Sequence, residues 1–260
     1  MRLVYSSGMA YFIAIAGNMG VGKSTLTERL AKKLGWKAYL EPTTENPYLS
    51  DFYGDMHRWG FHSQIFFLAH RLQQHSELAR AGIPVIQDRS VYENAEVFAR
   101  NLYERGFLSE RDWRTYQTIY ETLIALLPPP NLIIYLRASV STLMHRIENR
   151  GRDFEQKIDP NYLVELNRLH EEWAHGFTRA PILTVPTDRI NFVEDDAALE
   201  RLVATIMNTL PLQPLPLFDT SHPHPSHSTS RGLGGASPGF PASGLAQPSA
   251  SENPLSRCRE

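Results

Sequence analysis

Residues 17–24 read Gly17-Asn18-Met19-Gly20-Val21-Gly22-Lys23-Ser24, and this stretch decides the fold of the chain. It fits the phosphate-binding pattern G-x-x-x-x-G-K-[ST]. The apolar run from Tyr11 to Ala16 predicts a strand ahead of it, and leucines at four-residue spacing predict a helix from Ser24 to Leu34. Together these elements direct backbone N–H groups and a helix dipole at an anion. A glycine-rich turn without a ligand is the alternative, but the Lys-Ser ending in this context favours a nucleoside triphosphate.

The end of this loop supplies the groups that act on the nucleotide. Lys23 is expected to reach the β- and γ-phosphates, and the hydroxyl of Ser24 is a candidate ligand of Mg²⁺. We therefore expect residues 17–24 together with Thr25 to bind ATP, with Mg²⁺ as the cofactor. The motif does not say which group receives the phosphate.

The bulk composition restricts the class of protein. The formal net charge of −2 argues against a dedicated nucleic-acid surface, and no apolar run approaches the length that a membrane span needs. Cys258 is the only cysteine, which excludes an intramolecular disulfide, and no signal peptide is visible. These features predict a cytoplasmic enzyme that binds neither nucleic acid nor membranes.

The composition also divides the chain into three parts. Residues 211–260 are nearly half Pro, Ser and Gly, and they show no helical or strand period. Such a segment buries too little apolar surface to offset the entropy of ordering, so we expect a disordered tail. Residues 9–210 suit one α/β domain, and residues 1–8 are an expected N-terminal extension, with Met9 as a candidate start.

Apolar strands and helices alternate along the expected domain. We expect strands near residues 11–16, 36–41, 83–87, 131–136 and 182–185, and helices near residues 24–34, 47–53, 57–80, 92–103, 109–127, 139–149, 160–177 and 195–210. This alternation predicts a P-loop kinase-like α/β fold, with a five-stranded parallel sheet flanked by helices. Ligands of such sheets collect beyond the carboxyl ends of the strands, where Gly17, Glu41 and Asp88 lie.

Two of these strand ends carry candidate catalytic groups. Glu41 is the candidate base, since an unperturbed Glu is ionised at neutral pH, and an exposed strand-end charge is the alternative. Asp88 is a candidate Mg²⁺ ligand, and Arg89 is a candidate partner of the acceptor hydroxyl and of Glu41. A structural Asp–Arg pair that caps the next helix is the alternative for these two residues.

Further candidates lie on two helices. Arg146, Arg150 and Arg152 cluster around a glycine, and arginines over a transferring phosphoryl raise the rate about 10³- to 10⁵-fold. We expect them to form an arginine-rich lid, with a solvated basic helix end as the alternative. Gln64 and Arg71 lie on the long helix near several aromatic residues. An amide beside aromatic rings suits recognition of a nucleobase, although an aromatic stripe is more often core.

The order and spacing of these pieces resemble the deoxynucleoside kinase family, particularly its bacterial deoxyadenosine/deoxyguanosine kinase branch. The resemblance covers about residues 9–210. It rests on Gly22-Lys23-Ser24, Glu41-Pro42, Gln64 with Arg71, Asp88-Arg89-Ser90-Val91-Tyr92, Arg146-x-x-x-Arg150-Gly151-Arg152-x-x-Glu155-Gln156, Tyr162 and Leu169-His170-x-x-Trp173.

The resemblance implies transfer of the γ-phosphoryl of ATP to the 5′-hydroxyl of a deoxynucleoside in nucleotide salvage, by a homodimer. It implies that Glu41 is the base and that Arg89 holds both this base and the 5′-hydroxyl. It assigns further roles: the nucleobase to Gln64 and Arg71, the 3′-hydroxyl to Tyr53 and Glu155, and the lid to Arg146, Arg150 and Arg152.

The choice of substrate stays open at this point. The branch favours purines, but Asn94 stands near the base, where family members often have Asp, and an amide offers a donor as well as an acceptor. A pyrimidine deoxynucleoside kinase is therefore an alternative. A nucleoside monophosphate kinase is another, although Glu41 would repel the acceptor's phosphate. A nucleotide-binding switch subunit without a small-molecule acceptor is the alternative of a different class.

Overall fold

The computed structural model describes residues 11–40, 46–80, 82–152, 158–190, 192 and 195–210. All of them belong to the first of the two units into which the contacts divide the chain, Met1–Pro214 and Leu215–Glu260. The expected extension at residues 1–8, the expected tail at residues 211–260, and the candidates Glu41 and Glu155 lie outside the described residues.

A parallel sheet of five strands forms the centre of the described part of the chain. The strand order is β2-β3-β1-β4-β5, with β1 at Phe12–Gly17, β2 at Lys37–Tyr39, β3 at Val85–Asp88, β4 at Leu132–Arg137 and β5 at Ile182–Pro186. All residues of β1 and β3 are buried, as expected for strands covered on both faces. The predicted fold class is thus confirmed, although β2 is shorter than expected.

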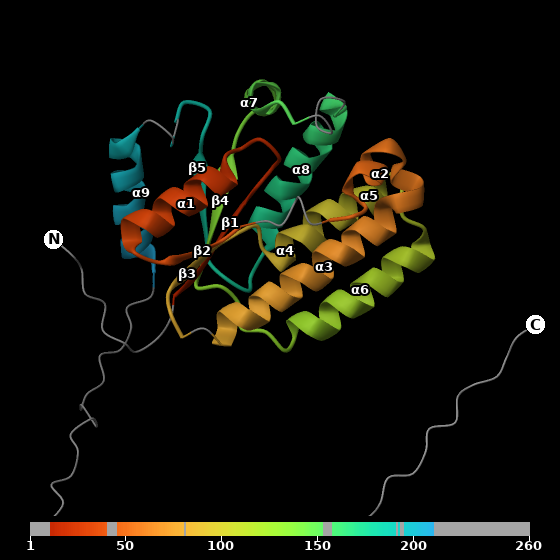
Figure 1. The fold of residues 1–260 in the computed structure, drawn as a ribbon, viewed down its shortest axis with the longest axis horizontal. Helices are drawn as coiled ribbons and strands as arrows, with labels where there is room; N and C mark the ends of the chain where they lie inside the picture. Colours follow the sequence, from red (N-terminus) through yellow and green to blue (C-terminus); the bar gives the residue numbers. More distant parts are fainter. Residues whose placement is uncertain are drawn as a thin grey trace, which may run out of the picture. The chain divides into compact units, whose positions relative to one another are not determined.

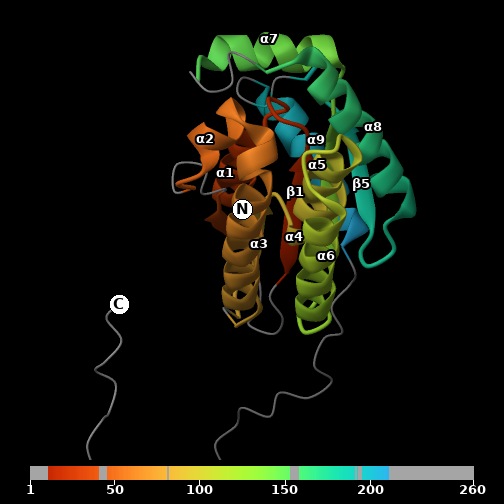
Figure 2. The same cartoon turned by 90° about the vertical axis from the view of Figure 1, so that its right-hand side faces the viewer.

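Helices cover both faces of this sheet. Their bounds are α1 Lys23–Leu34, α2 Leu49–Gly54, α3 Met56–Arg80, α4 Val91–Glu93, α5 Arg100–Glu104, α6 Glu110–Ile124, α7 Val140–Arg150, α8 Pro160–Gly176 and α9 Asp196–Thr209. α1 and α9 lie on one face, and α3, α4 and α8 lie on the other (Figure 1). α3 and α6 run side by side, and α7 crosses the top of the view in Figure 2.

Local capping explains where several helices begin. The hydroxyls of Ser109 and Ser139 accept hydrogen bonds from backbone N–H groups two residues inside α6 and α7, and Asp195 does the same for α9. These starts agree with the sequence prediction. Ser90 caps α4 in the same way, by accepting from the N–H of Glu93 at 3.1 Å.

The helix expected near residues 92–103 differs from the prediction in its middle. It runs without a break from α4 to α5, but residues Asn94–Ala99 form a π-helix, η1. Such wide turns are rare, and they occur frequently at functional sites. Asn94 and Phe98, both within η1, line the cavity described below.

Candidate active site

The phosphate loop joins β1 to α1, and its glycines are required by geometry. Gly17 has φ +141°, and a Cβ there would lie 2.6 Å from the carbonyl oxygen of Leu136 on the paired strand β4. A Cβ on Gly20 would lie 2.8 Å from Ile147 of α7. The loop is therefore held between the sheet and α7, in a shape that side chains larger than hydrogen do not fit.

Lys23 lies at the start of α1 and folds back over this loop. Its Nζ donates to the carbonyl oxygens of Gly17 and Asn18, at 2.8 and 2.9 Å, and the side chain is largely buried. The ammonium group is thus held beside the loop backbone that is expected to surround the phosphates. The contact of Lys23 with the β- and γ-phosphates stays a prediction.

Ser24 and Asp88 meet because β1 and β3 are neighbours in the sheet. The hydroxyl of Ser24 donates to Oδ2 of Asp88 at 2.5 Å, and Asp88 is fully buried at the end of β3. Hydroxyl and carboxylate oxygens are ligands that suit Mg²⁺, so this pair fits the expected metal. No cluster of three or more His, Cys, Asp or Glu side chains suited to a metal occurs among the described residues. The alternative role of Asp88 as a helix cap does not hold, because Ser90 caps α4.

Arg89 lies in the turn that follows β3, in a strained conformation. Its φ is +65°, and it is the only non-glycine residue with a positive φ in the described part of the chain. Its guanidinium lies 3.9 Å from the ring centroid of Phe98 in η1, and the side chain is nearly buried. Non-glycine residues in this region cost about 1–3 kcal/mol and cluster at active sites.

Arg71 binds the backbone of the Asp88–Arg89 turn through hydrogen bonds. The residue is fully buried on α3, and its Nη1 donates to the carbonyl oxygens of Asp88 and Arg89 at 3.0 and 2.6 Å. It is not among the residues that line the cavity described below. The structure therefore places Arg71 where it supports the Asp88–Arg89 turn, and its predicted role toward the nucleobase stays a prediction.

One cavity of about 400 Å³ joins the phosphate loop to the other candidates. This volume lies within the range of small-molecule sites. Of the predicted site residues, it is lined by Met19, Gly20, Gly22, Lys23, Ser24, Thr25, Tyr53, Gln64, Arg89, Asn94, Arg150 and Arg152. Gly17, Asn18, Val21, Asp88 and Arg146 do not line it.

Two buried amides face this cavity. Gln64 of α3 is 5% exposed, and its Oε1 has no hydrogen-bond partner among the described residues. Asn94 is 2% exposed, and its Nδ2 donates to the hydroxyl of Tyr116 on α6 at 3.2 Å. A buried acceptor without a partner is unfavourable unless a ligand satisfies it. The cavity therefore offers hydrogen bonds suited to the edge of a nucleobase.

The three arginines of the expected lid have different surroundings. Arg146 donates to the carbonyl oxygens of Val21 at 3.1 Å and Thr187 at 2.7 Å, and burial lowers its pKa. Arg146 therefore connects the phosphate loop to the segment that follows β5. Arg150 and Arg152, at the end of α7, line the cavity. The lid itself stays a prediction.

Sequence reasoning missed Glu93 as a site residue. Glu93 is fully buried, and its Oε1 accepts hydrogen bonds from the backbone N–H of Gly17 and from Nε2 of His170, both at 2.9 Å. The pattern Ser90-x-x-Glu93 resembles a capping box, in which the carboxylate would instead turn back to the helix start. His170 is visible in the sequence only as part of the family resemblance.

Comparisons with known proteins agree with this geometry. Residues 13–211 match the family described as deoxynucleoside kinase. The deoxyadenosine/deoxycytidine kinase of Bacillus subtilis is 38% identical over 200 residues, which cover 76% of this chain and 92% of that protein. The deoxyguanosine kinase of the same organism is 39% identical over 205 residues, which cover 76% of this chain and 96% of that protein.

A solved structure shows the same arrangement. Deoxyadenosine kinase from M. mycoides with bound dATP has a TM-score of 0.66 and 31% sequence identity, and the match covers 76% of this chain and 99% of that one. None of the helices in the described ranges is long and apolar enough to span a membrane. The family match extends over more than half of the chain and includes the whole candidate site. This chain therefore belongs to the deoxynucleoside kinase family.

Proposed function

We propose that this protein transfers the γ-phosphoryl of ATP to the 5′-hydroxyl of a purine deoxynucleoside, deoxyadenosine or deoxyguanosine. One observation carries the proposal. A single cavity is lined by the phosphate loop with Lys23 and by the two buried amides of Gln64 and Asn94. A site for a triphosphate and a site for a nucleobase therefore share one space, as transfer from one nucleotide to a nucleoside requires.

The residues divide into a donor half and an acceptor half. Lys23 would bind the β- and γ-phosphates, while Arg150 and Arg152 would stabilise the negative charge on the transferring phosphoryl. Ser24 and Asp88 would hold Mg²⁺, which neutralises charge on the phosphate oxygens.

In the acceptor half, Arg89 lines the cavity and would contact the 5′-hydroxyl. Glu41 would accept the proton of that hydroxyl, and Tyr53 with Glu155 would hold the 3′-hydroxyl. Glu41 and Glu155 lie outside the described residues, so their roles rest on the family resemblance. Assembly as a homodimer and a location in the cytoplasm are further predictions.

The preference for purines is supported by the relatives, and the amide of Asn94 suits both adenine and guanine. One relative is named for deoxyadenosine and deoxycytidine, and the other is named for deoxyguanosine. The hydroxyl of Tyr116 both donates and accepts, so the Asn94 amide keeps this hydrogen bond in either orientation. One orientation presents an oxygen to the 6-amino group of adenine, and the other presents an NH₂ group to the 6-oxo group of guanine.

An acceptor panel tests the proposal. The full chain is incubated with ATP and Mg²⁺ and with deoxyadenosine, deoxyguanosine, deoxycytidine, thymidine or dAMP, and both ADP and the nucleotide product are measured. We expect 5′-monophosphates of the two purine deoxynucleosides at the highest kcat/KM, and no turnover with Lys23→Met. ADP release independent of any acceptor would favour the switch subunit. Turnover of dAMP alone would favour a monophosphate kinase, and preferred turnover of pyrimidines would overturn the purine assignment.

A further inference from the structure

Glu93 and His170 form a fully buried pair behind the phosphate loop. Oε1 of Glu93 lies 2.9 Å from Nε2 of His170 and 2.9 Å from the backbone nitrogen of Gly17. The ring of His170 is stacked on Tyr135, with centroids 5.8 Å apart, and meets the ring of Phe98 edge-on at 5.6 Å. The imidazole therefore has one fixed orientation, with Nε2 directed at the carboxylate.

The hydrogen bonds of His170 define its role. Nδ1 lies 2.7 Å from the carbonyl oxygen of Leu166, which only accepts, so Nδ1 carries a proton. Burial on its own would raise the pKa of Glu93, but the charge of Arg89, followed by His170 and Lys23, lowers it. The carboxyl group of Glu93 and the ring of His170 are both fully buried and therefore shielded from water.

The carboxylate of Glu93 connects this pair to the cavity. Its negative charge acts on Lys23 and Arg89, which both line the cavity. The backbone of Gly17 connects Glu93 to Lys23, because its N–H donates to Glu93 and its carbonyl oxygen accepts from Nζ of Lys23 at 2.8 Å. A shift of Glu93 would thus move both the first residue of the loop and its lysine.

The helix α8, which carries His170, has a second connection to the loop. Nδ2 of Asn18 donates to the carbonyl oxygen of Leu163 at 3.0 Å and to Oδ1 of Asn167 at 2.7 Å. The phosphate loop therefore rests on α8 at two points, Gly17 through Glu93 and Asn18 directly. Of the residues at these two points, only Gly17 and Asn18 belong to the expected ATP site, and they are expected to act there through their backbone groups.

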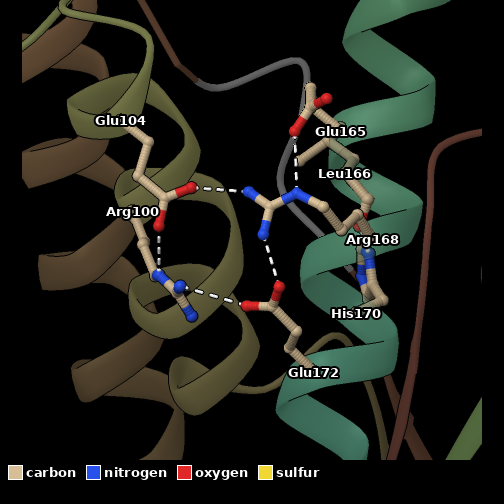
Figure 3. Close-up of polar contacts among 7 residues, drawn as sticks. All are labelled: Arg100, Glu104, Glu165, Leu166, Arg168, His170 and Glu172. Atoms are coloured by element: carbon tan, nitrogen blue, oxygen red, sulfur yellow. Dashed lines mark hydrogen bonds and ion pairs between the residues drawn. The ribbon is translucent and has the colours of Figure 1, made fainter.

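A ring of charged side chains holds α8 in place from the outside (Figure 3). Two arginines, Arg100 of α5 and Arg168 of α8, alternate in it with two glutamates, Glu104 of α5 and Glu172 of α8. The ring closes through contacts of 2.7 Å between Arg100 and Glu104, 2.6 Å between Glu104 and Arg168, and 3.1 Å between Glu172 and Arg100, together with the pair Arg168–Glu172. Its members are partly exposed, and none of them lines the cavity.

We propose that Glu93 and His170 are positioning residues, which place the phosphate loop and Lys23 for transfer of the phosphoryl group. The kinetic test of this inference rests on the proposed function, whereas the test by the Kd of ATP does not. The positioning acts mainly on the donor nucleotide, since the hydrogen bonds of the pair run to Gly17 and through it to Lys23. A misplacement of about 1 Å by a residue remote from the chemistry can lower turnover about 10²-fold.

The test compares Glu93→Gln and His170→Gln with a control on the same helix. Glu93→Gln keeps an acceptor for the Gly17 N–H but removes the charge, and His170→Gln keeps a donor for Glu93 but removes the ring. Arg168→Gln breaks the outer ring and leaves the pair intact. For each variant, kcat, the KM values of ATP and deoxyadenosine, the Kd of ATP without acceptor, and the Tm are measured.

We expect both variants of the pair to lower kcat about 10- to 100-fold and to raise the KM and Kd of ATP, with the KM of deoxyadenosine changed less than about threefold. Arg168→Gln should lower the Tm and leave the constants for ATP unchanged. The inference is overturned when the pair variants lower only the Tm, as the control does. If Glu93→Gln does not fold, His170→Gln decides the matter alone. If the wild type phosphorylates no deoxynucleoside, the proposed function fails, and the Kd of ATP still tests the pair.

Discussion

Replacing Gly17 and Gly22 separately by alanine distinguishes two reasons for glycine within one loop. Both have a positive φ, +141° and +103°, so each alanine carries a conformational cost of about 1–3 kcal/mol. Only at Gly17 does the new Cβ meet an obstacle, the carbonyl oxygen of Leu136 at 2.6 Å, whereas no atom lies within 4 Å of a Cβ at Gly22. The obstacle is backbone of β4, an interior strand of the sheet, and it cannot rotate away.

The extra cost at Gly17 is therefore that of overpacking, about 1–3 kcal/mol. For a folded part of this size, about 2–4 °C of Tm corresponds to 1 kcal/mol, so Gly17→Ala should melt about 2–12 °C below Gly22→Ala. Circular dichroism during thermal unfolding measures this difference. Gly22 lines the cavity, so Gly22→Ala should also weaken ATP binding in calorimetric titration.

Equal Tm values for the two variants, or a lower Tm for Gly22→Ala, would refute this reasoning. Gly35→Ala is the control for backbone conformation alone. Gly35 has φ +71° at the end of α1, a Cβ there would have no atom within 4 Å, and the residue lies away from the cavity. Gly35→Ala should lower the Tm without a change in ATP affinity.

Three further predictions concern charge. Asp88→Asn replaces the carboxylate beside Ser24 by a neutral amide, so kcat should fall at least about tenfold and a higher Mg²⁺ concentration should be needed for the half-maximal rate. An unchanged dependence of the rate on Mg²⁺ would contradict this prediction. Asn94→Asp leaves only acceptors at the base, so the ratio of kcat/KM for deoxyadenosine over deoxyguanosine should rise at least about tenfold, and an unaltered ratio would exclude contact with the base. Hydrogen bonds from Ser139 lower the pKa of Asp188 to about 2, below the 3.8 of the unperturbed group. This stabilisation is present above about pH 4 and is lost as the pH falls toward 2, so the gap in unfolding free energy between wild type and Asp188→Asn should be larger in urea titrations at pH 6 than at pH 3.

The parts of the structure that local pattern determines could be predicted. β1, the phosphate loop and α1 follow each other directly, and their apolar runs, glycines and Lys23 carry the information within about 25 residues. Asp88 and the start of the phosphate loop were predicted at the same edge of the sheet, and the structure adds the contact between Ser24 and Asp88 there.

The remaining features depend on partners far apart in the chain. Glu93 contacts Gly17 and His170, which lie 76 and 77 residues away, and its local pattern indicates a helix cap instead. Arg146 and Arg150 share a helical face, yet only contact with the segment around Thr187 separates their roles. No spacing along the chain reports such contacts.

The number of residues in the π-helix η1 determines which way the side chains on either side of it point. Glu93, directly before η1, contacts the phosphate loop, and Asn94 and Phe98 within η1 line the cavity. Arg100, directly after η1, belongs to the ring of charged side chains on α5 and α8. Each residue turns the chain by about 100° in an α-helix and by less in the wider turn of η1, so removing one residue from η1 would rotate one of these groups away from its partners. Single substitutions at exposed positions leave that phase unchanged, whereas a one-residue deletion alters it for every residue beyond.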